Sequence, residues 1–316
     1  MPASPSFRSA SRLGLATAFL TFCLIVIGSV VRTTGSGLAC PDWPLCQGRL
    51  IPPFEFHVLI EWFHRLVALL VSLSIVSLAA WTLATSALRR RLGGLGVLLV
   101  CLLAAQVLLG ALTVWKLLDP SVVSGHLGVA LLIFGTLVTY TRRAREMSVE
   151  PARATRPAGR LAAFAAATTL TYLQALLGGV VSSRHAGLAC PDWPTCFGEW
   201  LPPLSGPVGL QMAHRLGGYL LTAAVLVAAA SVRNGPDRPL RRAGTTALVL
   251  VVAQVIFGVS NVYLRTPVWL SALHLATATA LLGVLLDATL RLAALPRAAA
   301  AAGPVPVLRA NQVASS

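Results

Sequence analysis

The sequence has very little charge. Only 11% of its 316 residues are Asp, Glu, Lys or Arg, whereas a soluble domain carries about a quarter. Hydrophobic residues make up 56% of the chain and the mean hydropathy is +0.77. This composition excludes an ordinary soluble domain and indicates a protein that lies largely in lipid.

Long apolar runs recur along the whole chain. Their length of roughly 18–22 residues is what a helix needs to cross a bilayer. The first run lacks a small-residue cleavage site followed by a soluble domain, so we interpret it as a helix and not as a signal peptide. The sequence predicts an all-α integral membrane protein with eight transmembrane helices, at about 13–31, 61–84, 94–115, 122–141, 160–181, 209–231, 243–262 and 268–291.

Acidic residues are scarce, and the net charge is +15. Nucleic-acid binding is one explanation of such a balance, but 18 of the 25 basic residues fall on one side of the predicted spans. These are Arg8, Arg12, Arg89, Arg90, Arg91, Arg142, Arg143, Arg145, Arg153, Arg156, Arg160, Arg233, Arg238, Arg241, Arg242, Arg291, Arg297 and Arg309. The positive-inside rule places this side, with both termini, in the cytoplasm. The basic excess is therefore a topology signal, and we expect no nucleic-acid partner.

The chain contains an internal repeat. The segment Gly37–Pro44 returns unchanged as Gly187–Pro194, and further matches follow at offsets of 150 and 148. Four spans separate the two copies, so both have the same orientation in the membrane. We predict two tandem, duplicated four-helix bundles with cytoplasmic flanks. The divisions are a cytoplasmic N-terminus (1–12), a first half (13–141), a cytoplasmic linker (142–159), a second half (160–291) and a disordered cytoplasmic tail (292–316).

Four of the six histidines form matched pairs in this repeat. His64 corresponds to His214, and His126 corresponds to His274. All four are expected in the first turns of helices that run inward from the outer face, so two imidazoles face each other in each half. This arrangement is typical of a haem whose iron is ligated from both sides. Zinc would require further N, S or carboxylate ligands. The structural alternative is a set of interfacial hydrogen-bonding residues, although ionisable groups inside spans usually serve a function.

An acidic residue distinguishes the two halves. Glu61 stands three residues before His64 and on the same helix face, whereas the second half has the neutral Gln211 at this place. We interpret the first half as the reacting site and the second as an electron-handling site. The structural alternative is an acid that caps a helix N-terminus. Arg65 and Arg215 follow the paired histidines directly, and they either bind haem propionates or extend toward the membrane surface.

Two cysteine pairs lie in the predicted outer loops. They are Cys40 with Cys46 and Cys190 with Cys196, and disulfides persist outside the cytoplasm. Each pair is either a structural link or a redox-active pair that exchanges electrons with an external thiol carrier. The spacing does not decide between these alternatives.

Together, the Glu61-x-x-His64-Arg65 signature, the four histidines and the Cys40/Cys46 pair resemble the haem A synthase family, called CtaA in bacteria. The resemblance covers residues 13–291. It implies oxidation of the C8 methyl group of haem O to a formyl group, which yields haem A for haem–copper oxidases.

Carried onto this chain, the resemblance makes His64 and His126 the residues that flank haem O and makes Glu61 essential to its oxidation. His214 and His274 would ligate haem b, the expected cofactor, which relays electrons. The second cysteine pair departs from the pattern of many members, which leaves the role of Cys190 and Cys196 open.

The resemblance also implies partners and a location. Haem O carries a long farnesyl tail, so it would enter from the lipid. Haem O synthase and an external thiol–disulfide carrier are the candidate protein partners, an oligomer is compatible with the sequence, and a bacterial plasma membrane is the expected location. The competing functions are an electron-transfer cytochrome b, a haem transporter and a thiol–quinone oxidoreductase.

Overall fold

The structure, a computed structural model, describes residues 5–148 and 159–296. The helices in these ranges are α1 (Pro5–Thr33), α2 (Phe56–Ala84), α3 (Ser86–Trp115), α4 (Pro120–Glu146), α5 (Arg160–Ser183), η1 (Ala186–Leu188), α6 (Gly206–Val232), α7 (Arg238–Tyr263) and α8 (Val268–Ala294). All eight α-helices are long and apolar enough to cross a membrane. The predicted number of spans and the all-α class are thereby confirmed.

Most helices extend beyond the predicted spans. α1 begins at Pro5 and not near residue 13, and α2 begins at Phe56 and not near residue 61. The apolar pattern marks only the part of each helix that lies at the depth of the lipid tails. A helix can continue beyond it into the interfacial layer. α4 likewise runs to Glu146, into the predicted linker, of which 149–158 lie outside the described residues. Of the tail predicted to be disordered, 297–316 also lie outside them.

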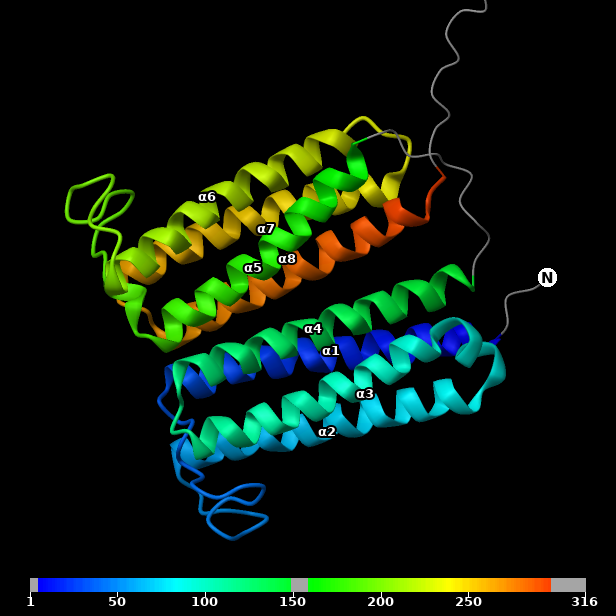
Figure 1. The fold of residues 1–316 in the computed structure, drawn as a ribbon, viewed down its shortest axis with the longest axis horizontal. Coiled ribbons are helices and arrows are strands. Elements are labelled where there is room, and N and C mark those ends of the chain that lie inside the picture. Colours follow the sequence, from blue (N-terminus) through cyan, green and yellow to red (C-terminus); the bar gives the residue numbers. More distant parts are fainter. Residues whose placement is uncertain (1–4, 149–158, 297–316) are drawn as a thin grey trace, which may run out of the picture.

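The helices form two bundles that lie side by side (Figure 1). In the first, α1 and α3 each pack against both α2 and α4, and in the second α5 and α7 each pack against both α6 and α8. The helices that carry the paired histidines therefore stand diagonally across each bundle. The loops at 34–55 and 184–205 lie at one end of the molecule, opposite the end where α1 begins and α8 ends (Figure 1). That this second end faces the cytoplasm stays a prediction.

Small residues bring the two halves into contact. A methyl group added to Gly128 of α4 would lie 2.9 Å from Leu176 of α5, and one added to Gly179 would lie 2.8 Å from Leu127. Helices in lipid associate largely through close packing of this kind. Arg32 of α1 also donates a hydrogen bond of 2.9 Å to the carbonyl of Ser182. The two candidate sites are thus held in one packed assembly.

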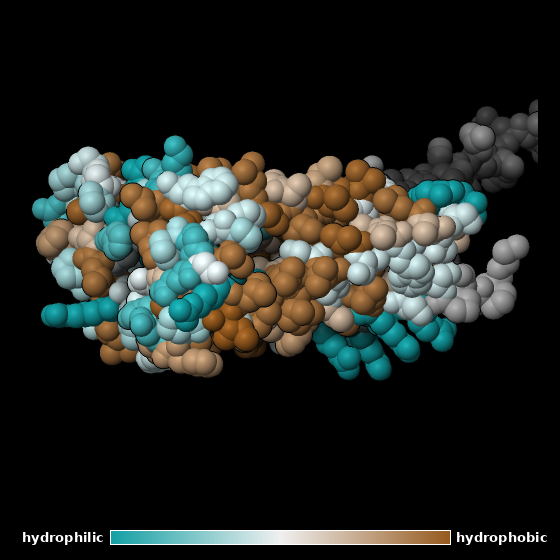
Figure 2. Space-filling model, turned by 90° about the horizontal axis from the view of Figure 1, so that it is seen from below, coloured by the Kyte–Doolittle hydropathy of each residue, from teal (hydrophilic) through white to brown (hydrophobic). Residues whose placement is uncertain are grey.

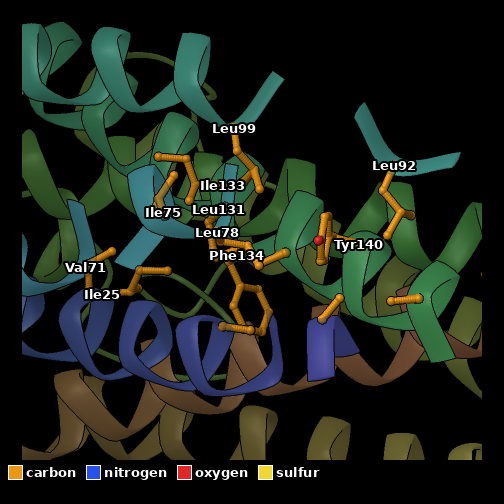
Figure 3. Packing of buried hydrophobic residues seen from close by; sticks show 14 of the residues in the cluster. Ile25, Val71, Ile75, Leu78, Leu92, Leu99, Leu131, Ile133, Phe134 and Tyr140 are labelled. Atoms are coloured by element: carbon orange, nitrogen blue, oxygen red, sulfur yellow. The ribbon is translucent and has the colours of Figure 1, made fainter. Parts of the chain in front are cut away.

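An apolar core fills each bundle on the side away from the outer loops. In the first half, Ile75 and Leu78 of α2 are fully buried with Leu131 and Leu137 of α4 (Figure 3). On the face shown in Figure 2, hydrophobic residues cover the middle of the molecule and hydrophilic residues gather toward both ends. The core fixes the helices rigidly, so that the histidines near the loop end are positioned by the scaffold.

Candidate functional site

The paired histidines lie at matched depths, but deeper along their helices than expected. His64 and His214 each follow the start of α2 or α6 by eight residues, or about 12 Å of helix, and not by a single turn. His126 and His274 follow the starts of α4 and α8 by six residues. α2, α4 and α6 begin before the predicted spans, which adds to this distance, whereas α8 begins at Val268 as predicted and His274 lies beyond its first turn. The imidazoles therefore lie well inside each bundle, below the outer loops.

A glycine on a neighbouring helix faces each of these imidazoles. A methyl group built on Gly28 or Gly110 would lie 3.3 Å from Cε1 of His64 or His126, respectively. The second half repeats this arrangement at 3.0 Å for Gly178 and His214 and at 3.1 Å for Gly258 and His274. Carbon atoms in good contact lie about 3.5–4.0 Å apart. Only glycine leaves room for the rings, so each histidine lies in a cradle that a Cβ would fill.

The histidine pair of the second half has the spacing that a haem held between two imidazoles would require. The ring centroids of His214 and His274 are 6.4 Å apart, and two metal–nitrogen bonds of about 2 Å with two ring half-widths require roughly 6 Å. Nδ1 of His64, His126 and His274 is buried and has no hydrogen-bond partner in the described part of the chain. Among the same residues, no group of three or more His, Cys, Asp and Glu side chains could hold a metal ion. The donor set is thus two imidazoles per site.

Glutamines lie beside three of the four histidines. Nε2 of Gln106 and of Gln254 lies 3.4 Å and 3.2 Å from Nε2 of His126 and His274, respectively. Gln174 donates to the carbonyl of His214 at 2.6 Å, and its Nε2 lies 3.0 Å from Nδ1 of the ring. In each case the glutamine stands four residues before the cradle glycine. The fourth helix, α1, has Leu24 at this position.

Glu61 is buried and bound to the first outer loop. Its side chain accepts hydrogen bonds from the backbone N–H of Cys40 at 2.8 Å and from Arg65 at 2.6 Å, and the residue is only 4% exposed. Arg65 also donates to the carbonyls of Cys40 and Asp42, at 2.8 Å and 2.7 Å, and to that of Leu45. The guanidinium therefore ties the acid to the loop above the histidines.

The second half keeps the arginine but changes the acid. Arg215 donates to the carbonyls of Cys190 and Thr195, at 2.9 Å and 2.7 Å. Gln211 donates to the carbonyl of Gly187 at 3.1 Å, and its Oε1 is buried without a partner among the described residues. The two loops are held alike, but only the first half carries a buried carboxylate. In both halves the arginine binds loop carbonyls, so contacts with propionates stay a prediction.

Both cysteine pairs form disulfides. Cys40 and Cys46 have Cα atoms 4.6 Å apart, and Cys190 and Cys196 have Cα atoms 4.8 Å apart. An aspartate turn supports each ring. In the second loop, the backbone N–H of Gly198 and then the hydroxyl of Thr195 lower the pKa of Asp192 from 3.8 to about 2. All four cysteines are buried, and the geometry fits a structural link without deciding their redox role.

The cradle glycines and Gln174 carry a signal in the sequence that our interpretation of the motifs did not use. A Gln-x-x-x-Gly spacing occurs at Gln106 and Gly110, at Gln174 and Gly178, and at Gln254 and Gly258. The spacing identifies one face of a helix, but not the neighbour that the face contacts. That contact with histidine becomes visible only once the helices are packed.

Comparisons with known proteins identify the family of the chain. The family model COX15-CtaA, described as cytochrome oxidase assembly protein, matches residues 11–286. The Heme A synthase of Symbiobacterium thermophilum is 33% identical over 255 residues, which cover 78% of this chain and 83% of the relative. That of Bacillus licheniformis is 29% identical and covers 86% and 92%, and that of Paracoccus denitrificans is 30% identical and covers 89% and 87%. The chain belongs to the COX15-CtaA family.

Proposed function

We propose that this protein is a haem A synthase, an enzyme that oxidises a methyl group of haem O to a formyl group and so makes haem A. The Heme A synthase relatives and the family match support this function. Eight apolar helices and the bacterial relatives indicate a multi-pass protein of the bacterial plasma membrane. The observation that carries the proposal is the buried carboxylate of Glu61, which stands above one histidine pair and is absent above the other.

The two histidine pairs have different tasks in this proposal. His64 and His126 hold the substrate haem O, and His214 and His274 hold haem b. When bound, haem b supplies an electron-transfer centre. All four rings are enclosed by a glycine in the same way, so each pair can hold a haem. The polar groups around the rings differ between the halves, and this difference supports the division of tasks. Gln174 fixes the backbone at His214, whereas the corresponding Leu24 can form no such bond.

Glu61 acts on the substrate edge that faces the outer loop. Its negative charge is balanced by Arg65 at 2.6 Å, and charge-assisted hydrogen bonds of this kind hold a carboxylate firmly in place. In this position the carboxylate would stabilise positive charge that develops on the substrate edge beside it. Gln211 does not have this capacity, which agrees with a second half that holds a cofactor without changing it.

The remaining assignments follow from this division. The C8 methyl group is the position oxidised, and Arg65 and Arg215 lie close enough to the histidines to bind propionates if the loop contacts rearrange. Haem O synthase is the candidate supplier of the substrate. An external thiol–disulfide carrier would act on Cys40 and Cys46, whose loop contacts Glu61 directly.

The experiment is an analysis of the haems extracted from membranes that supply haem O, with and without this protein, by mass-resolved chromatography. We expect haem A only when the protein is present. The informative variant is Glu61→Gln, which gives the first half the side chain of the second, and its matched control is Gln211→Glu. We expect Glu61→Gln to retain haem b and form no haem A. Unchanged haem O beside bound haem b in the wild type would instead indicate an electron-transfer cytochrome.

A further inference from the structure

An apolar groove runs along the outer half of α3, only in part covered by other residues. It has a volume of about 490 Å³, within the range of roughly 300–1,000 Å³ typical of sites for small organic ligands. Trp43 from the first disulfide loop and Trp115 close its outer end, with ring centroids 6.1 Å apart in an edge-on contact. Along the helix the groove is lined by Ala104, Val107, Leu108 and Ala111.

The groove adjoins the candidate substrate site at two points. Val107 and Ala111 flank Gly110, the residue that cradles His126. Trp43 belongs to the Cys40–Cys46 ring, whose backbone N–H at Cys40 binds Glu61. The groove therefore lies next to residues that enclose the candidate substrate site, on an exposed face of α3.

Some positions on this helix face carry larger side chains in the second half, whereas two carry smaller ones, because Leu103 corresponds to Val251 and Trp115 to Tyr263. At the offset of 148, Ala104 and Ala111 of α3 correspond to Val252 and Val259 of α7. The added methyl groups occupy the space that the two alanines leave open. The two halves thus differ in the shape of this face, and in the half that carries Glu61 the two alanines make room along the middle of the helix.

We propose that this groove binds the isoprenoid chain of the substrate haem. The inference rests on the proposed function, which makes a farnesylated haem the ligand of the first half. Lipid tails are as apolar as the groove, so transfer of the chain from the bilayer adds little affinity. The groove instead orients the haem. A haem held only by two axial histidines can rotate about the axis through them, and a chain fixed along α3 selects the rotation that presents one edge to Glu61.

The occupant can be identified by photo-crosslinking of the full-length protein in lipid nanodiscs. p-Benzoylphenylalanine replaces Leu108 in the groove or, as the matched control, Ile256 at the same place on α7. These residues are 56% and 54% exposed, so both probes meet the bilayer equally. With added haem O, we expect an adduct with the mass of haem O at position 108 and lipid adducts alone at position 256. Protohaem, which has a vinyl group in place of the chain, should leave only lipid adducts at both positions.

Lipid adducts alone at position 108 in the presence of haem O would overturn the proposal and identify the groove as an ordinary lipid contact. A second test fills the groove with Ala104→Val and Ala111→Val together. We expect haem A formation to fall by roughly tenfold or more through misorientation, with haem b content unchanged. The control Ala105→Val makes the same change outside the groove and should have no effect. If the double variant forms haem A at the same rate as Ala105→Val, the groove proposal is wrong and the proposed function stands. Absence of haem A with the wild-type protein would instead refute the proposed function.

Discussion

The glycine cradles allow a quantitative test of the second site. In Gly178→Ala, the new methyl group would lie 3.0 Å from Cε1 of His214, about 0.5–1 Å inside normal carbon contact. The ring must tilt or the two helices must separate. Overpacking of this kind costs about 1–3 kcal/mol, and alanine returns roughly 0.5–1 kcal/mol through its higher helix propensity. The middle of these two ranges leaves a cost of about 1.2 kcal/mol, which corresponds to a loss of haem b affinity of roughly eightfold.

The assay is the transfer of haem b from the purified protein to apomyoglobin, followed by the change in visible absorbance. Gly94→Ala is the control for helix propensity, because nothing lies within 4 Å of the methyl group it adds. Gly28→Ala is the control for position, because its methyl group lies 3.3 Å from His64 in the other half. We expect faster transfer from Gly178→Ala alone. A rate equal to that of both controls would show that the ring does not depend on the cradle.

The other predictions concern the acid, the ligands and the second loop. Glu61→Gln should abolish haem A formation while haem b absorbance is retained. His214→Ala should lose stable haem b, measured as haem per protein after purification, and His274→Ala should do the same. Gln174→Leu should speed haem b transfer several-fold, because the hydrogen bond to the His214 carbonyl is worth about 0.5–1.5 kcal/mol. Because the pKa of Asp192 is lowered, its loop contacts are complete above about pH 4 and are lost as the pH falls toward 2. Pepsin should therefore cut the wild-type loop increasingly as the pH falls through this interval. It should cut the loop of Asp192→Ala already at pH 4.

The bilayer makes much of the fold predictable. Spans are marked by the length and apolarity of their sequence, and the repeat alone indicates that His64 and His214 occupy equivalent places. The helix ends are less predictable, since nothing in the apolar pattern marks the continuation of α2 outward to Phe56. For α2, α4 and α6 this outward continuation places the histidines further from the helix start than the sequence predicts, and all four histidines lie about 9–12 Å along their helices.

Contacts between segments are the part that the sequence could not supply. Gly110 and Gly258 are recognisable as matched residues, but their role depends on which side chain of the neighbouring helix faces them. Arg65 is open to two interpretations in the sequence, and the structure instead directs its donors to Glu61 and to carbonyls of the disulfide loop. That arrangement depends on how the loop folds over α2, which the ring closed by Cys40 and Cys46 and the turn at Asp42 determine jointly.

Four of the differences between the halves share one physical direction. Each difference in the second half either adds a bond that fixes a histidine, fills the space beside it or removes a charge above it. The pairs are Leu24 with Gln174, Ala104 with Val252, Ala111 with Val259 and Glu61 with Gln211. A cofactor site gains from every such change, because a resident group should stay bound. A substrate site would lose by them, since its ligand must enter, react at one edge and leave in each turnover. Under the proposed function, divergence of these positions after duplication would let one four-helix design hold one haem and modify another.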